Sequence, residues 1–328
     1  MSDNPARNPI FARVAHRLKL LGGVVIALAV IGLAIYFAAP GWVLKAAIRY
    51  QTWHDGLYQH TVQVGDTRWV YVAGGKQDGP PLVLVHGYGG SYADWLMTAR
   101  YLTSNFHVII PDLPGWGAST RIAGADYGYA AQVQRLHGFV DALHLGEIAL
   151  AGHSMGGAIA GLYAAKYPKD IAALVLIDSA GVEFKQNAFV RQLEAGKSPF
   201  DIDNRAEFKQ LEAMLFAKPP SVPPRIEDVF VARSQHNRAF DDKVLRAIAA
   251  PDARYALQAK LPDITAPTLA IWCTKDQIID VSALDAIRKG LTHAPNIGVT
   301  ELTGCGHMSI MEKPREVARS ISRFVLLP

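Results

Sequence analysis

Short apolar runs alternate with stretches of helical periodicity along most of this chain. Residues 61–64 and 68–73 flank a turn at Gly65-Asp66 and predict an antiparallel hairpin at the edge of a sheet. Six compact runs rich in valine, isoleucine and leucine follow, at residues 82–86, 107–111, 147–152, 172–178, 268–272 and 296–302. Runs of this composition are typical of strands that are covered on both faces. The eight segments together predict one mostly parallel sheet.

Helical patterns separate these apolar runs. They cover residues 92–103, 130–143 and 154–167, a segment near 282–289, and a last segment after Pro314. Alternating strands and helices build a parallel sheet with right-handed crossovers, so we expect helices on both faces of the sheet. The predicted fold class is therefore α/β.

The alternation is interrupted between residues 181 and 261. Charged and aromatic residues mix there with a proline-rich stretch at 219–224. We interpret residues 181–261 as a cap inserted after the sixth strand, which leaves residues 61–180 and 262–328 as the core. A chain of 328 residues, half of them hydrophobic, has enough material for one large core with a subdomain.

An uncharged stretch at residues 20–39 predicts a transmembrane anchor, because a helix needs about 20 residues to cross a bilayer. A cleaved signal peptide is the alternative, but its apolar region usually has about 7–15 residues and ends at a small-residue cleavage site that is not evident here. Basic residues are more frequent before the stretch than after it: Arg7, Arg13, Arg17 and Lys19 precede it, and Lys45 and Arg49 follow. The positive-inside rule therefore predicts that residues 1–19 are cytoplasmic and that the rest lies on the periplasmic or extracellular side.

The juxtamembrane segment, residues 40–60, has an amphipathic pattern. Its apolar stripe recurs at helical spacing and consists of Trp42, Ala46, Tyr50, Trp53 and Leu57. Such a helix could rest among the lipid headgroups of the bilayer. The alternatives are an aromatic belt that fixes the anchor, or a helix packed on the globular domain.

One turn carries the strongest chemical signal. Residues 150–157 read Leu-Ala-Gly-His-Ser-Met-Gly-Gly, where an apolar run ends and a small-residue helix begins. Gly152 and Gly156 allow the tight turn and the close approach of helix to sheet. Ser154 would then project its hydroxyl above the sheet, as a nucleophile does.

A serine nucleophile needs a base, and the base needs a third group that fixes its tautomer. His307 lies in a glycine-rich loop directly after the last expected strand, and Asp276 follows the strand before it. Both would reach the same sheet edge in the chain order serine, acid, histidine. Asp178 and Asp280 are the alternative acids, and their structural interpretations are a loop contact and a helix N-cap.

Acyl transfer also needs N–H donors where the carbonyl oxygen becomes negative. One candidate is the backbone N–H of Met155, at the start of the helix that follows the serine. The other is the N–H of Tyr88, in the glycine-rich loop 87–90. His86 and His153 lie close in sequence to these positions, but neither follows the last strand, so we expect structural roles for them.

Composition and charge exclude some partners. The chain has 33 Lys and Arg against 29 Asp and Glu, and a basic block with interleaved aromatics is missing outside the N-terminus, so we expect no nucleic-acid partner. No cluster of histidines, cysteines and carboxylates has metal-ligand spacing, so we expect no metal and no cofactor.

Cys273 and Cys305 are too few for a disulfide scaffold. Neighbouring strands could nevertheless bring them together, and a disulfide between the acid and histidine loops, in an oxidising compartment, is a hypothesis.

From about residue 69 to the C-terminus the chain resembles the α/β-hydrolase family, and within it the membrane-anchored monoacylglycerol lipases. The likeness extends beyond the serine turn to Tyr-Ala-Leu-Gln at 255–258, Ile-Trp at 271–272, Lys-Asp-Gln at 275–277, Cys-Gly-His at 305–307 and Met-Glu-Lys-Pro at 311–314. The resemblance implies an α/β-hydrolase fold, with Ser154, Asp276 and His307 as a catalytic triad and Tyr88 and Met155 as oxyanion donors. Cys273 departs from the glycine that usually follows the tryptophan.

The resemblance also implies a lipid ester substrate, such as a monoacylglycerol, that is cleaved through an acyl-enzyme at a membrane. Apolar residues of the cap could line an acyl pocket, namely Phe184, Phe189, Met214, Leu215 and Phe216. Alternatively, they form a small core of the cap itself.

Three other functions remain open at this point. A carbon–carbon bond hydrolase of ring-cleavage diketo acids uses the same triad on the same fold. It would need cations in the cap, where Arg191, Arg205, Arg233 and Arg238 are available. A small-ester esterase or thioesterase is the second alternative, and a noncatalytic membrane scaffold is the third.

Overall fold

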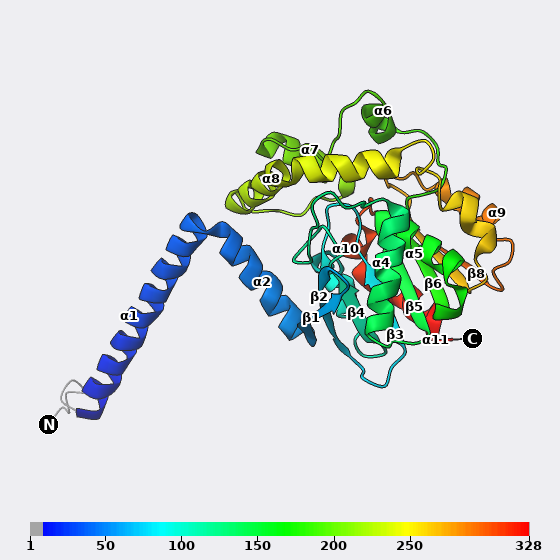
Figure 1. The fold of residues 1–328 in the computed structure, drawn as a ribbon. Helices are drawn as coiled ribbons and strands as arrows, with labels where there is room; N and C mark the ends of the chain where they lie inside the picture. The colour runs from blue at the N-terminus through cyan, green and yellow to red at the C-terminus, as the bar shows by residue number, and fades with distance from the viewer. Residues whose placement is uncertain (1–8, 328) are drawn as a thin grey trace.

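The computed structural model describes residues 9–327. A long N-terminal helix projects away from a globular body, and the helices of the cap lie across one edge of the sheet in that body (Figure 1). The sheet edge beneath the cap is where β5, β6 and β7 end, so residues that follow these strands lie under the cap.

One sheet contains eight strands in the order β1-β2-β4-β3-β5-β6-β7-β8. The strands are β1 Leu57–Val64, β2 Thr67–Gly75, β3 Pro81–Val85, β4 His107–Pro111, β5 Ile148–His153, β6 Ile171–Ile177, β7 Thr268–Cys273 and β8 Ile297–Leu302. The pairs β1–β2 and β2–β4 are antiparallel, and all other neighbours are parallel. The mostly parallel sheet with an antiparallel edge, expected from the sequence, is confirmed.

Alternate residues of the central strands face opposite layers of helices. In β3, Val83 and Val85 pack in the cluster that contains α4, α5 and α9, whereas Leu82 and Leu84 pack in the cluster that contains α3, α10 and α11. The helices are α3 Leu96–Ala99, α4 Tyr129–Ala142, α5 Met155–Lys166, α9 Ala283–Gly290, α10 Ser309–Glu312 and α11 Pro314–Leu326. Because both faces are covered, the central strands are apolar throughout.

The helix expected over residues 92–103 is much shorter in the structure. A 3₁₀ turn at Tyr92–Trp95 leads into α3, which ends at Ala99. The chain then continues in tight turns, in which the N–H of Leu102 bonds the carbonyl of Ala99. These turns bury Leu102 and Phe106 against the sheet, so tertiary packing overrides the helical pattern.

The segment 181–261 forms three helices and a 3₁₀ turn. They are α6 Ala188–Glu194, α7 Arg205–Leu215, α8 Pro224–Ala249 and the 3₁₀ segment Gln258–Asp263. Asn187 and Asn204 accept backbone N–H bonds at the starts of α6 and α7. The proline-rich stretch ends at Pro224, the first residue of α8, where the missing N–H of proline costs nothing.

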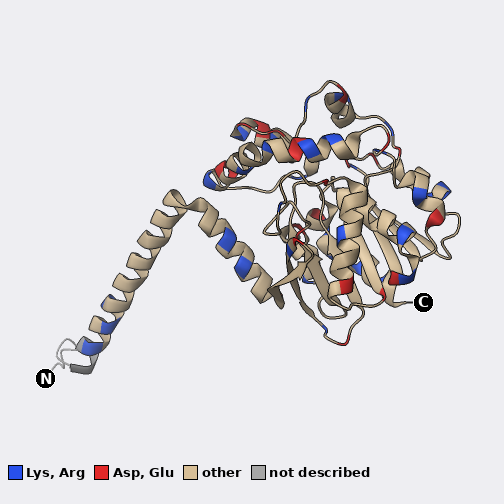
Figure 2. Cartoon of the chain, in the orientation of Figure 1, with Lys and Arg blue, Asp and Glu red and all other residues tan. Residues whose placement is uncertain are grey.

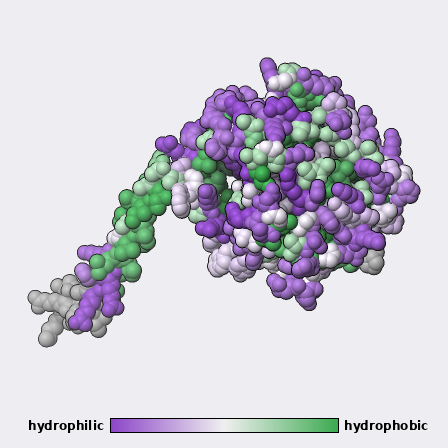
Figure 3. Space-filling model, viewed as in Figure 1, coloured by the Kyte–Doolittle hydropathy of each residue, from purple (hydrophilic) through white to green (hydrophobic). Residues whose placement is uncertain are grey.

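The projecting helix, α1 Pro9–Ala38, is long and apolar enough to cross a membrane. Its side chains between residues 20 and 38 form a hydrophobic band that is exposed (Figure 3). Figure 2 shows basic side chains at the N-terminal end of α1 and on the next helix, with an uncharged stretch between them. The apolar helix suggests a membrane anchor.

The next helix, α2 Pro40–His54, has two different faces. Ile48 and Thr52 face the globular domain, whereas Trp42, Tyr50 and Trp53 are exposed.

Leu57 does not continue the exposed stripe, which corrects the expectation for this residue. The helix ends at His54, Gly56 turns the chain with φ +73°, and Leu57 opens β1 with its side chain buried. The first strand therefore begins four residues earlier than residue 61.

Candidate active site

Ser154 lies in the turn between β5 and α5, with φ 56° and ψ −121°. This left-handed conformation is rare for a residue with a side chain and is strained. The flanking glycines allow it, because a Cβ on Gly152 would lie 2.1 Å from the carbonyl oxygen of Gly156, and one on Gly156 would lie 2.4 Å from that of Val85. The sharp turn leaves the Ser154 hydroxyl at the end of the sheet, under the cap.

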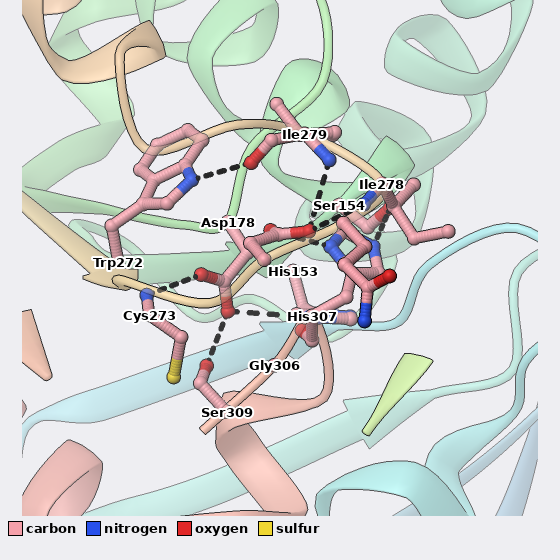
Figure 4. Close-up of polar contacts among 12 residues, drawn as sticks. His153, Ser154, Asp178, Trp272, Cys273, Ile278, Ile279, Gly306, His307 and Ser309 are labelled. Carbon is pink, nitrogen blue, oxygen red and sulfur yellow. Dashed lines mark hydrogen bonds and ion pairs between the residues drawn. The ribbon is translucent and has the colours of Figure 1, made fainter. Parts of the chain in front are cut away.

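The structure brings Ser154, His307 and Asp276 together. Oγ of Ser154 lies 2.9 Å from Nε2 of His307, and Nδ1 of His307 lies 2.8 Å from Oδ2 of Asp276. Figure 4 shows the serine turn and the histidine loop meeting beside the segment that follows β7. Residues separated by 153 and 31 positions in the chain thus form one hydrogen-bonded series.

Asp276 is oriented by its own loop. The backbone N–H groups of Ile278 and Ile279 donate to its Oδ1 at 2.8 and 2.9 Å, so Oδ2 is left to face His307. Burial raises the pKa of Asp276, and these two N–H bonds act in the opposite direction because they stabilise the carboxylate.

Burial also decides the charge of His307. It lowers the pKa of the imidazole to about 3, so the ring is neutral around pH 7. A neutral ring that donates from Nδ1 to Asp276 has a free lone pair on Nε2, which accepts the hydroxyl proton of Ser154. This is the tautomer that a general base requires.

The two alternative acids lie elsewhere. Asp178 accepts hydrogen bonds from the backbone N–H of Cys273 and from Oγ of Ser309, and it is fully buried. Asp280 accepts the N–H of Ser282 just before α9, a helix-start contact of the kind considered from the sequence. Ser309 was missed by the sequence reasoning, because a serine within a short helix carries no signal that it will meet a carboxylate 131 positions away.

The two candidate oxyanion donors face the same region. Within residues 9–327, neither the N–H of Met155 nor that of Tyr88 donates to another residue. Both residues line a cavity together with Ser154. A Cβ on Gly87 would lie 3.1 Å from Cβ of Ser154, so the glycine-rich loop passes directly beside the serine.

Two cavities meet at Ser154 and Tyr88. Cavity A, of about 300 Å³, extends between α6, the C-terminal half of α8 and the loop after β7, and its lining is mainly apolar. Cavity B, of about 360 Å³, extends between α7, the N-terminal half of α8 and the histidine loop. Its polar lining includes Asp94, Glu212, Arg233 and Asp241.

The expected acyl-pocket residues divide between these cavities. Phe184 and Phe189 line cavity A, and Leu215 and Phe216 line cavity B. Met214 lines neither of the two and packs against the main hydrophobic core instead. The reason is the helical period, since the face of α7 that lines cavity B carries residues 208, 211, 212 and 215.

Cys273 and Cys305 form a disulfide with a Cα–Cα distance of 5.4 Å. The hypothesis that these two residues pair is confirmed. The bridge joins the loop that carries Asp276 to the loop that carries His307. Among the described residues, no group of three or more histidines, cysteines and carboxylates could hold a metal ion.

A family model described as the alpha/beta hydrolase fold matches residues 80–314. This chain belongs to the alpha/beta hydrolase family, as its resemblance predicted.

Its relatives include lipases. The chain is 36% identical over 272 residues to Lipase 1 of Psychrobacter immobilis, with 80% of this chain and 82% of the relative covered. It is 32% identical over 300 residues to monoacylglycerol lipase ABHD6 of Homo sapiens, with 86% and 87% covered. A crystal structure described as a membrane phospholipase A, a bacterial virulence factor, superimposes with a TM-score of 0.84 at 32% identity, covering 94% of this chain and 99% of that one.

Proposed function

We propose that this chain is a membrane-anchored serine hydrolase that cleaves monoacylglycerols or related fatty acyl esters, with Ser154 as the nucleophile. The observation that carries the proposal is the hydrogen-bonded series from Ser154 through His307 to Asp276, beside two cavities with apolar walls. The relatives named lipase and monoacylglycerol lipase support hydrolysis of lipid esters.

In the first half of the reaction, Oγ of Ser154 attacks the ester carbonyl carbon while Nε2 of His307 accepts the hydroxyl proton. Asp276 stabilises the imidazolium that forms, because its carboxylate accepts the Nδ1–H bond. The N–H groups of Tyr88 and Met155 bind the oxyanion, and the positive end of α5 contributes at the second site. The tetrahedral intermediate then collapses, and His307 returns the proton to the leaving alcohol.

The second half regenerates the enzyme. A water molecule, deprotonated by His307, attacks the acyl carbon of the acyl-Ser154 ester, and the same two N–H groups bind the second oxyanion. Collapse of this intermediate breaks the bond to Oγ, which recovers its proton from His307. The products are a fatty acid and an alcohol.

The two cavities suggest how a substrate is placed. Cavity A has a mainly apolar lining and accepts the fatty acyl chain, whose burial is favourable at about 0.8 kcal/mol per CH₂. Cavity B carries carboxylates and Arg233 among apolar residues, which suits an alcohol with free hydroxyl groups such as glycerol. We therefore place the glycerol end of a monoacylglycerol in cavity B.

The carbon–carbon bond hydrolase is less well supported, because its acidic substrate would need cations beside Ser154. Of the four cap arginines considered for it, Arg205 pairs with Asp228 and Arg238 with Asp203, and Arg191 lines neither cavity. Arg233 lines cavity B, but three carboxylates share that cavity. The charges around the site thus favour a neutral ester.

A small-ester esterase differs from the proposal in the size of the acyl group, a thioesterase in its thiol leaving group, and a scaffold in having no chemistry. Cavity A is larger than a short acyl group requires, and its apolar walls extend away from Ser154. A scaffold would need neither a strained serine nor two unpaired N–H groups beside it.

We also propose that the catalytic domain lies on the periplasmic or extracellular side. The basic residues before the uncharged stretch 20–39 support this orientation through the positive-inside rule. A disulfide beside the site supports it independently, because such bonds persist in oxidising compartments.

The test is to profile the purified full-length protein, in detergent micelles, against monoacylglycerols of several chain lengths, a phospholipid, a short ester, a thioester and a dienolic diketo acid. We expect fatty acid release to be fastest from a monoacylglycerol. Faster turnover of the diketo acid or the short substrates would replace the proposal by the corresponding alternative. Failure to react with a fluorophosphonate probe would favour the scaffold.

A further inference from the structure

One side chain of the cap reaches the glycine-rich loop beside Ser154. Arg233, in α8, donates from Nη2 to the carbonyl oxygen of Gly89 at 2.9 Å, across 144 positions of sequence. Gly89 directly follows Tyr88, whose N–H serves as an oxyanion donor in the proposed function. The contact therefore joins the cap to the loop that carries this donor.

The orientation of the Tyr88 N–H depends on the carbonyl of Gly87, because both groups belong to one planar peptide unit. The Gly87 carbonyl accepts two hydrogen bonds, one from Nδ1 of His86 at 2.8 Å and one from the N–H of Gly90 at 3.2 Å. Burial lowers the pKa of His86 to about 4, so this ring is neutral and donates from Nδ1. These two bonds set the direction of the oxyanion donor.

The N–H of Gly90 belongs in turn to the peptide unit whose carbonyl is that of Gly89. Arg233 therefore holds the peptide unit 89–90, and the N–H of that unit holds the peptide unit 87–88. Gly89 has φ +69°, and glycines at 87, 89 and 90 leave the loop many alternative conformations. A loop of this composition needs fixed partners if its N–H is to stay aimed at one point.

The charges around Arg233 leave its guanidinium available to hold the peptide unit 89–90. Within residues 9–327, no carboxylate lies within ion-pair distance of Arg233, whereas Arg238, one turn further along α8, is paired with Asp203 of the cap at 2.7 Å. Asp94, which is partly buried beside the loop, accepts the N–H of Ser91 and feels the positive charge of Arg233 from a greater distance.

The helix that carries Arg233 is held from both sides. Near its N-terminal end, Cγ1 of Val229 lies 4.0 Å from the position of a Cβ on Gly41, in α2. The guanidinium of Arg225 lies 5.5 Å from the ring centroid of Phe37, in α1. Figure 1 shows this end of α8 beside the corner between α1 and α2. The cap helix thus contacts α1 and α2 at Arg225 and Val229, and it meets the glycine-rich loop at Arg233, one to two turns later.

We propose that Arg233 is a positioning residue for the oxyanion hole: from the cap it fixes the peptide unit 89–90, and through it the direction of the Tyr88 N–H. This inference rests on the proposed function, because Arg233 has this role only if the Tyr88 N–H binds an oxyanion. Its consequence is that the position of the cap and the strength of the oxyanion hole are coupled.

The test compares Arg233→Gln and Arg233→Lys with Arg238→Gln, a matched loss of an arginine on the same helix. Each full-length variant is assayed with a short p-nitrophenyl ester, which has no glycerol to contact cavity B, and with a monoacylglycerol. Removing an oxyanion donor costs about 100–1,000-fold in kcat, and loosening a donor that remains present should cost less. We therefore expect Arg233→Gln to lower kcat about tenfold on both substrates with little change in KM, and Arg233→Lys to recover part of the loss. Arg238→Gln should stay close to the wild type.

The outcomes separate this inference from the proposed function. An unchanged kcat in Arg233→Gln on the short ester would overturn the inference, as would a loss confined to KM for the monoacylglycerol, which would indicate headgroup binding. An equal loss in Arg238→Gln would also overturn it, because the effect would then belong to the stability of the cap. Melting temperatures of the variants identify any misfolded protein. If Arg233→Gln does not fold, Arg233→Lys provides the test. If the wild type hydrolyses neither ester, it is the proposed function that fails.

Discussion

His153 donates a hydrogen bond from Nε2 to the backbone carbonyl oxygen of His307 at 2.8 Å. The residue immediately before the proposed nucleophile therefore holds the proposed base in place. Burial lowers the pKa of His153 to about 3, so its ring is neutral and donates one N–H. The same Nε2 lies 4.0 Å from the carboxylate of Asp178, which in turn contacts Ser309 in the helix after the histidine loop.

Replacing His153 with phenylalanine keeps a ring in this buried position and removes the donor. An unpaired buried carbonyl costs about 1–3 kcal/mol, part of which would appear as misplacement of His307. We expect kcat for a monoacylglycerol to fall about tenfold and the melting temperature to fall by a few degrees. A variant with full kcat would show that Asp276 alone is sufficient to position His307.

The choice of acid can be tested by comparing Asp276→Asn with Asp178→Asn. The asparagine at position 276 removes the negative charge that stabilises the imidazolium and permits the wrong tautomer, so kcat should fall about 10⁴-fold. Asp178 contacts Cys273 and Ser309 rather than the His307 ring, so its variant should affect stability more than chemistry. If Asp178→Asn were inactive but folded while Asp276→Asn retained activity, Asp276 would not be the acid.

With His307 as the proposed base, the pH dependence of kcat/KM should report its imidazole in the free enzyme. The base must be neutral, and burial lowers its pKa from 6.5 to about 3, so the neutral form persists as the pH falls below 6.5. We expect kcat/KM for a neutral ester at pH 5.5 to stay close to its value at pH 7.5. An imidazole with an ordinary pKa would be about nine-tenths protonated at pH 5.5, and kcat/KM would fall about tenfold. Such a fall would show that the ring is more solvated than in the structure.

The disulfide between Cys273 and Cys305 closes a loop with a sequence separation of 32. A loop of this length implies about 3–4 kcal/mol of stabilisation by the chain-entropy model. We expect Cys273→Ser to lower the free energy of unfolding by about that amount and to reduce kcat less than Asp276→Asn does. Alkylation of thiols before and after reduction tests the bond in protein extracted from cells. Free thiols before reduction would contradict both the bond in the cell and the proposed location outside the cytoplasm.

The order of helices and strands could be predicted because two signals in the sequence agree: the hydrophobic pattern of the strands and the residue types at the turns. The runs of β3, β5, β6 and β7 are almost entirely apolar since helices cover both faces, and the glycines around Ser154 have close backbone contacts that exclude a Cβ. Local patterns failed where packing decided the outcome. Leu57 fits a helical stripe by spacing, but a turn at Gly56 places it in the sheet core.

The site could be predicted as far as the residues that follow strand ends, because parallel strands bring their carboxyl ends to one edge. Contacts across the cap could not be predicted. Nothing in the sequence around Arg233 distinguishes it from Arg238, since its partner is a backbone carbonyl 144 positions away. Met214 was expected in the acyl pocket as one apolar residue among neighbours, and the direction of α7 turns it toward the core.

The most direct test of the central claim is fatty acid release from a monoacylglycerol by the purified full-length protein and by its Ser154→Ala variant. If Ser154 is the nucleophile, the variant should lose a factor of about 10⁴ or more in kcat, fail to react with a fluorophosphonate probe, and keep the melting temperature of the wild type. Turnover by Ser154→Ala at the rate of the wild type would contradict the assignment.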